Sequence, residues 1–107
     1  MDLTNILAQN NYNFTAKTYP EREVGGKKIR REIKFYNYKE DASGYVIFFD
    51  DMTVSYNVKK GRKRTKDFFA GNTKHRMNRV SRLLFDCNYQ DHTKKKKLGR
   101  ERISSFR

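Results

Sequence analysis

The fold of this chain follows from residues 27–58, which read KKIRREIKFYNYKEDASGYVIFFDDMTVSYNV. Residues 28–38 alternate between apolar and polar, residues 45–49 are continuously apolar, and residues 52–58 alternate again. Alternation with a period of two is typical of a half-buried strand, and a short apolar run is typical of a central one. We therefore predict an antiparallel sheet with residues 45–49 near its centre, joined by turns at 39–44 and 50–51.

The two faces of the segment 28–38 differ in chemistry. One face carries Ile29, Ile33 and Phe35, with Arg31 interrupting, and we expect a helix to cover it. The opposite face is suited to tracking a nucleic-acid backbone and stacking on bases, and it forms a second candidate binding surface, made of Lys28, Arg30, Lys34, Tyr36 and Tyr38. An ordinary solvent-facing strand that uses Tyr for its β-propensity explains the same residues equally well.

On the N-terminal side of this stretch, residues 12–18 also alternate, and Gly25-Gly26 predicts a hairpin that folds residues 12–23 against 27–38. Residues 3–9 are long enough for one or two helical turns.

Near the C-terminal end the period changes from two to that of a helix. One stripe is apolar and consists of Met77, Val80, Leu83, Leu84 and Cys87. The opposite stripe consists of His75, Arg79, Arg82 and Asp86. Asn72 or Thr73 is the expected N-cap, and Phe68 and Phe69 are expected to pack beneath the helix start.

These elements predict a small α+β domain over residues 1–90, with an antiparallel sheet of about four strands and one main C-terminal amphipathic helix. A basic loop at residues 59–66 joins the sheet to that helix. Residues 91–107 are nearly devoid of apolar side chains, and we expect them to form a basic, disordered tail.

The net charge of +13 is confined to the second half of the chain. Residues 1–58 contain eight basic and eight acidic side chains, whereas residues 59–107 contain seventeen and four. Such an asymmetry indicates a polyanionic partner, although one basic helix stripe alone would more often be a solvated surface. The candidate nucleic-acid contacts are Lys59, Lys60, Arg62, Lys63, Arg64, Lys66, Lys74, Arg76, Arg79, Arg82, Lys94, Lys95, Lys96 and Lys97.

Several classes of protein are not expected. The longest apolar run, residues 45–49, is far below the roughly 20 residues of a membrane span, and with no secretory signal we expect a cytoplasmic location. Cys87 is single, and neither His75 nor His92 has metal-ligand spacing to it. Pro20-Glu21 with Glu32-Ile33-Lys34 resembles a metal-dependent nuclease pattern, but the chain has no room for that superfamily's flanking helices. We expect neither catalysis nor a cofactor.

The order of helix, strands, basic loop and helix resembles the double-stranded-RNA-binding domain in outline, and residues 61–66 resemble the basic approach to that family's last helix. The sheet followed by a helix is also similar to the sheet-reading DNA-binding domains of integrases. These resemblances imply nucleic-acid binding, to DNA or RNA.

Two hypotheses therefore remain. The first is a non-catalytic nucleic-acid-binding protein that contacts phosphates through the basic loop, the basic helix stripe and the Lys-rich tail. The second is a phage or mobile-element inhibitor, similar to anti-CRISPR proteins, that binds a host nucleic-acid enzyme or its guide-RNA complex. The surplus of tyrosine also leaves a homodimer open.

Overall fold

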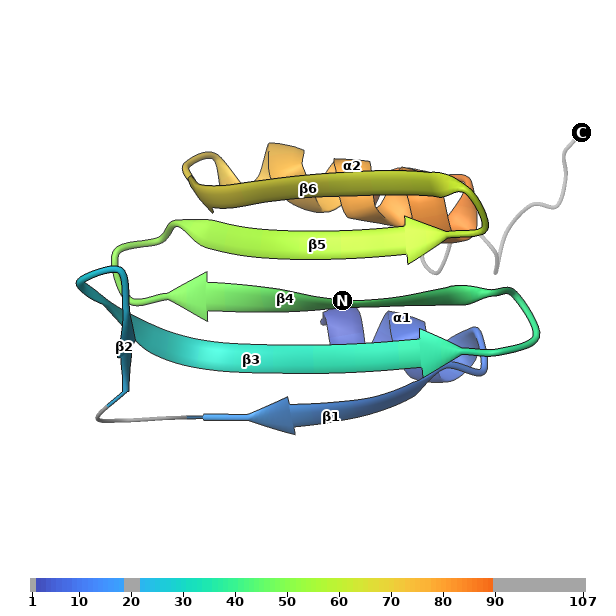
Figure 1. The fold of residues 1–107 in the computed structure, drawn as a ribbon, viewed down its shortest axis with the longest axis horizontal. Helices are drawn as coiled ribbons and strands as arrows, with labels where there is room; N and C mark the ends of the chain where they lie inside the picture. Colours follow the sequence, from blue (N-terminus) through green and yellow to red (C-terminus); the bar gives the residue numbers. More distant parts are fainter. Residues whose placement is uncertain (1, 19–21, 90–107) are drawn as a thin grey trace, which may run out of the picture.

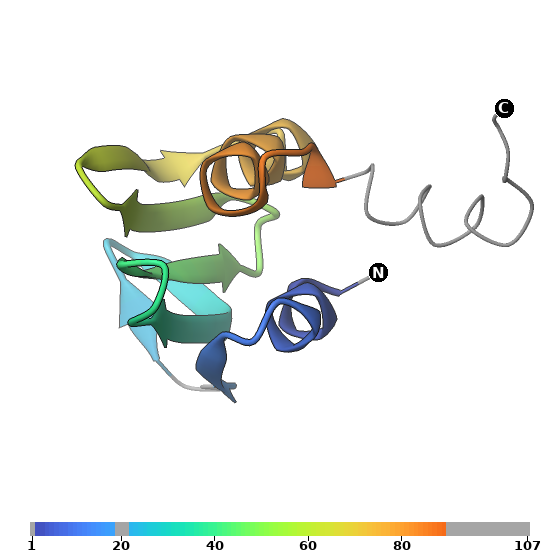
Figure 2. The same cartoon turned by 90° about the vertical axis from the view of Figure 1, so that its right-hand side faces the viewer.

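The computed structural model describes residues 2–18 and 22–89, which form one antiparallel sheet covered on one side by two helices (Figures 1 and 2). In chain order the elements are α1 (Leu3–Gln9), β1 (Asn13–Lys17), β2 (Glu23–Val24), β3 (Lys27–Asn37), β4 (Ala42–Phe49), β5 (Val54–Lys60), β6 (Lys63–Ala70) and α2 (Thr73–Phe85). The strand order is β1-β3-β4-β5-β6, and β2 pairs with β3. The α+β class and the antiparallel sheet are confirmed, and the described ranges hold six strands where about four were predicted. They also hold two helices: the main C-terminal helix and α1, at the residues 3–9 where one or two helical turns were expected.

Two segments account for the additional strands. Gly25 and Gly26 form the expected turn, with φ of 58° and 79°, but it joins β3 to the short β2. β1 pairs with β3 further along, at residues 32–36. The predicted basic loop is instead the β5–β6 hairpin, which turns at Gly61 with φ of 61°. A positive φ is easily adopted by glycine because it has no Cβ.

The core lies between the sheet and the two helices. The predicted apolar stripe of α2 is confirmed for Met77, Val80 and Leu84, which are buried in one cluster with Ile33 and Phe35. α1 contributes further buried side chains, Leu3 and Leu7, to the same cluster. The two helices therefore cover the sheet face on which the apolar residues alternate. Burying each such side chain contributes about 1.5–3 kcal/mol to the stability of the fold.

The start of α2 differs from the prediction in one detail. Asn72 precedes the helix with a left-handed backbone, φ 56°, and makes no side-chain capping bond. Thr73 instead donates its hydroxyl hydrogen to the backbone oxygen of Met52, at 2.7 Å, which ties the helix start to the β4–β5 turn. None of the helices in the described ranges is long and apolar enough to cross a bilayer.

The Asp51 carboxylate in the β4–β5 turn is expected to stabilise the fold in a way that is lost in acid. Asp51 accepts a hydrogen bond from Lys27 and two from Thr53, one from its hydroxyl at 2.6 Å and one from its amide at 3.0 Å. These bonds lower the pKa of Asp51 from 3.8 to about 2. A carboxyl whose folded pKa is depressed stabilises the fold above its unfolded pKa and loses that effect as the pH falls through the folded value.

We therefore expect Asp51→Asn to destabilise the protein at pH 6 and to make a much smaller difference at pH 2, where the Asp51 carboxyl is partly protonated in the folded state. Urea unfolding of both proteins across this range measures the difference in free energy. A difference that stays constant from pH 6 to pH 2 would show that the carboxylate charge contributes nothing.

Candidate nucleic-acid interface

Figure 2 shows that both helices lie on the same side of the sheet, so in the described part of the chain the opposite side carries no helix. Residues paired across neighbouring antiparallel strands project from the same face, and the pairing register therefore assigns each side chain. Two complete rows cross this side of the sheet from β1 to β6. The first row is Asn13, Tyr36, Ser43, Lys59 and Arg64. The second row is Thr15, Lys34, Tyr45, Asn57 and Lys66. We call these ten residues the open face.

The open face is strongly cationic. Its two rows contain four basic side chains and no carboxylate. A third row adjoining them consists of Lys17, Glu32, Ile47 and Ser55, and it adds one charge of each sign. Clustered charge of one sign creates a local potential that attracts a polyanion.

A bulge in β3 divides the predicted second surface. The register with β4 shifts between Ile29 and Arg31, which leaves Arg30 as the additional residue of the bulge. The Arg30 guanidinium lies over the Phe48 ring, 5.9 Å from its centroid, and Phe48 packs against the helix-side core. Beyond an inserted residue, each position of a strand projects to the face opposite to the one that strict alternation predicts. Arg30 therefore does not share a face with Lys34.

Lys28 lies beyond the same bulge. Its neighbour Ile29 pairs with Phe49, which follows Ile47 by two residues and so projects toward the open side. Successive residues in a strand project to opposite faces, which places Lys28 on the helix side. Of the five residues predicted for this surface, the structure keeps three together, namely Lys34, Tyr36 and Tyr38.

A second bulge, in β6, corrects the predicted position of Phe69. The pairing between β5 and β6 shifts across Phe68 and Phe69, and the Phe69 amide donates to the Ser55 hydroxyl at 2.8 Å. The Phe69 ring packs against Phe49, with the centroids 5.3 Å apart. It also lies close to Gly25, where an added Cβ would meet the ring at 2.7 Å. Phe69 thus packs with the β2–β3 turn rather than beneath α2.

Some of the basic residues on the helix side are engaged within the fold. Arg76 forms an ion pair with Asp67 at 3.2 Å, and Lys60 donates to the Leu84 carbonyl oxygen at 3.1 Å. These partners tie the β5–β6 hairpin to α2. Two of the predicted nucleic-acid contacts therefore have structural partners.

Arg31 is a third engaged cation on this side, and it binds Asp2 at 3.0 Å. Burial acts to raise the pKa of Asp2, but the hydrogen bond from Thr4 and the Arg31 charge outweigh it and lower the pKa below its ordinary value.

The remaining predicted contacts fall on separate surfaces. Lys74, Arg79 and Arg82 are exposed on α2, on the side of the sheet away from the open face. Arg62 and Lys63 lie at the β5–β6 turn and line a depression of about 340 Å³ together with Leu83 of α2. Lys94, Lys95, Lys96 and Lys97 lie outside the described residues. The structure therefore divides the predicted basic loop: Lys60, Arg62 and Lys63 lie beside α2, whereas Lys59, Arg64 and Lys66 belong to the open face.

The basic residues of the open face differ from Arg31, Lys60 and Arg76 in their partners. Among residues 2–18 and 22–89, no carboxylate forms an ion pair with Lys34, Lys59, Arg64 or Lys66. Arg64 donates one hydrogen bond to the side-chain oxygen of Asn57, at 2.6 Å, which orients its guanidinium across β5. An amide leaves the positive charge of the guanidinium uncompensated.

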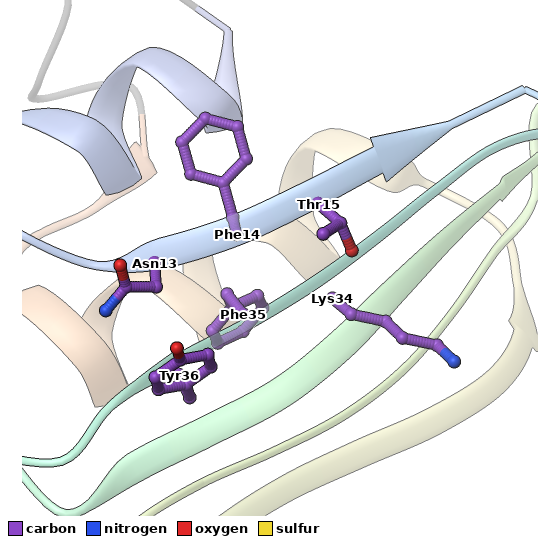
Figure 3. Close-up of a pocket in the computed structure, with 6 residues that line it drawn as sticks. All are labelled: Asn13, Phe14, Thr15, Lys34, Phe35 and Tyr36. Carbon is purple, nitrogen blue, oxygen red and sulfur yellow. The ribbon is translucent and has the colours of Figure 1, made fainter.

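Exposed aromatic side chains lie beside these cations. The rings of Tyr36 and Tyr38 are 4.6 Å apart at an interplanar angle of 34°, and these residues are 39% and 85% exposed. Tyr36 and Lys34 project from the same side of β3, whereas Phe14 projects from β1 toward α1 (Figure 3). A depression of about 410 Å³ borders Tyr36, Lys34, Asn13 and Thr15.

The search for a metal centre and for related proteins gave no result for the described part of the chain. Within the part of the chain that the structure describes, no three His, Cys, Asp or Glu side chains are grouped to hold a metal ion. Comparison with protein-family models, with curated proteins and with solved structures gave no match.

Proposed function

We propose that this chain is a non-catalytic nucleic-acid-binding protein and that the open face is its contact surface. The observation that carries the proposal is the grouping of four cations, Lys34, Lys59, Arg64 and Lys66, in two adjacent rows that contain no carboxylate. Arg31, Lys60 and Arg76 have carboxylate partners on the helix side, whereas within the described ranges the cations of the open face have none. Charges left without an internal partner are available to phosphates.

The arrangement across the sheet supports a phosphate ligand in particular. Neighbouring strands lie about 4.8 Å apart, so Lys59 on β5 and Arg64 on β6 form a pair at adjacent positions of one row. Lys66 lies two residues along β6, in the second row, roughly 7 Å from Arg64 by strand rise. Lys34 belongs to the same row as Lys66 but lies on β3, three strands away across the sheet. Cations distributed over several strands match a backbone that carries one charge per nucleotide better than they match a single small anion.

The test compares two double variants in which the net charge falls by the same amount. Lys34→Gln with Lys66→Gln removes two cations of the open face, and Lys74→Gln with Arg79→Gln removes two exposed cations of α2. Affinity of the full chain for labelled oligothymidylate and for a labelled DNA duplex is measured by fluorescence anisotropy over a range of salt concentrations. Circular dichroism verifies that each variant is folded.

We expect the open-face variant to bind at least about tenfold more weakly than the unmodified chain. The slope of log affinity against log salt concentration should become less steep by roughly 0.7–0.9 for each phosphate that is no longer neutralised. The α2 variant should bind nearly as well as the unmodified chain. Equal reductions of affinity in both variants would mean that only net charge matters and would refute the open face as the contact surface. If the unmodified chain binds no nucleic acid near physiological salt, the proposal fails and an acidic protein surface becomes the partner to seek.

A further inference from the structure

The pair formed by Tyr36 and Tyr38 points to the kind of nucleic acid that the open face takes. We infer that this face binds single-stranded nucleic acid and stacks an unpaired base on the tyrosine pair, an inference that rests on the function proposed above. The rings already lie 4.6 Å apart, and Tyr38 remains 85% exposed. Much of the Tyr38 surface is therefore free to accept a further aromatic ring.

The pair lies beside the cations rather than apart from them. Tyr36 belongs to the same row as Lys59 and Arg64. By strand spacing these two residues lie roughly 10 and 14 Å from Tyr36 across the sheet. A nucleotide chain running across the strands from β3 toward β6 would place one base on the tyrosines and its neighbouring phosphates on the basic residues. Proteins that bind single strands combine these same two features.

The surface beside Tyr36 has room for a base. The depression of about 410 Å³ there carries polar side chains from β1, Asn13 and Thr15, together with Lys34. Lys34 and Tyr36, both drawn in Figure 3, line this depression together. A flat ring packed on Tyr36 would thus meet hydrogen-bonding groups at its edge and a cation within reach of its phosphate.

A duplex would use this surface poorly. Its bases are stacked and paired inside the helix, so the tyrosine rings would face sugar and phosphate instead of a base. Only the electrostatic contribution would remain, and that contribution does not distinguish one polyanion from another. The exposed tyrosines therefore predict a preference for unpaired bases over paired ones.

The test uses three labelled ligands with the full chain. The first is oligothymidylate of about 12 nucleotides, within the roughly 4–16 nucleotides that comparable sheet surfaces cover. The second is an abasic oligomer of the same length and charge, and the third is a duplex of the same length. Each is titrated against the unmodified chain, against Tyr36→Ala with Tyr38→Ala, and against Tyr36→Phe with Tyr38→Phe, which keeps both rings.

We expect oligothymidylate to bind about tenfold or more tightly than the abasic oligomer and the duplex, because neither of those two ligands can stack an unpaired base on the tyrosines. The alanine variant should lose that advantage and retain its affinity for the abasic oligomer, and the phenylalanine variant should keep both. Equal affinity for all three ligands, with no effect of the alanine changes, would overturn the single-strand inference. The proposed function would survive that result provided the Lys34 and Lys66 changes still weaken binding. Failure of every ligand to bind would overturn both.

Discussion

Replacing Leu84 by Asp is expected to unfold the domain. Leu84 is 3% exposed and packs in the α2 stripe with Met77 and Val80 against the sheet. Truncating a buried leucine costs about 2–5 kcal/mol, and an unpaired carboxylate in the same place costs more. A domain of this size has only about 5–15 kcal/mol of stability in total.

Circular dichroism and thermal unfolding measure this effect, with Arg79→Asp as the matched control. Arg79 is exposed on the same helix, so introducing a carboxylate there should leave the cooperative transition nearly in place. A cooperative transition of the Leu84→Asp protein at the unmodified midpoint would mean that α2 does not present this stripe to the sheet.

The second large effect is expected at Gly44, within β4. A Cβ at this position would lie 2.5 Å from the Asn57 carbonyl oxygen and 2.7 Å from the Val58 Cα. Both atoms belong to the backbone of β5, so relief requires the two strands to separate where they pair. We expect Gly44→Ala to destabilise the protein by about 2–3 kcal/mol, at the upper end of overpacking changes.

Gly71→Ala is the control for this change, because an added Cβ there meets no atom of the described residues within 4 Å. Urea unfolding of the two variants isolates the close approach from the general effect of replacing glycine. Equal stability of the two proteins would show that β4 and β5 can move apart at little cost.

Parts of this fold are evident in the sequence. The helical stripe of Met77, Val80 and Leu84 and the apolar run at 45–49 both come from burial on a regular element, which leaves a periodic trace. β6 leaves little trace, because Ala70 is its one buried residue and much of the strand is polar or charged. The pattern of residues 59–66 therefore favours a loop, although the segment forms a hairpin.

The candidate site was predictable in composition but not in arrangement. Alternation correctly places Lys34 and Tyr36 together, and it wrongly adds Arg30 to them. A bulge adds one residue and leaves no mark in the pattern, yet it reverses every face beyond it. The grouping of Lys59 and Arg64 with Tyr36 depends on pairing across four strands, which no single segment encodes.

The position of β6 at the end of the strand order has a consequence for assembly. Its outer backbone groups have no neighbouring strand in the described sheet, and such an edge is open to pairing with another chain. The bulge and the charged side chains of β6 oppose that pairing, because two like-charged edges repel. A polyanion bound as proposed would neutralise Arg64 and Lys66 and so weaken the repulsion between two such edges.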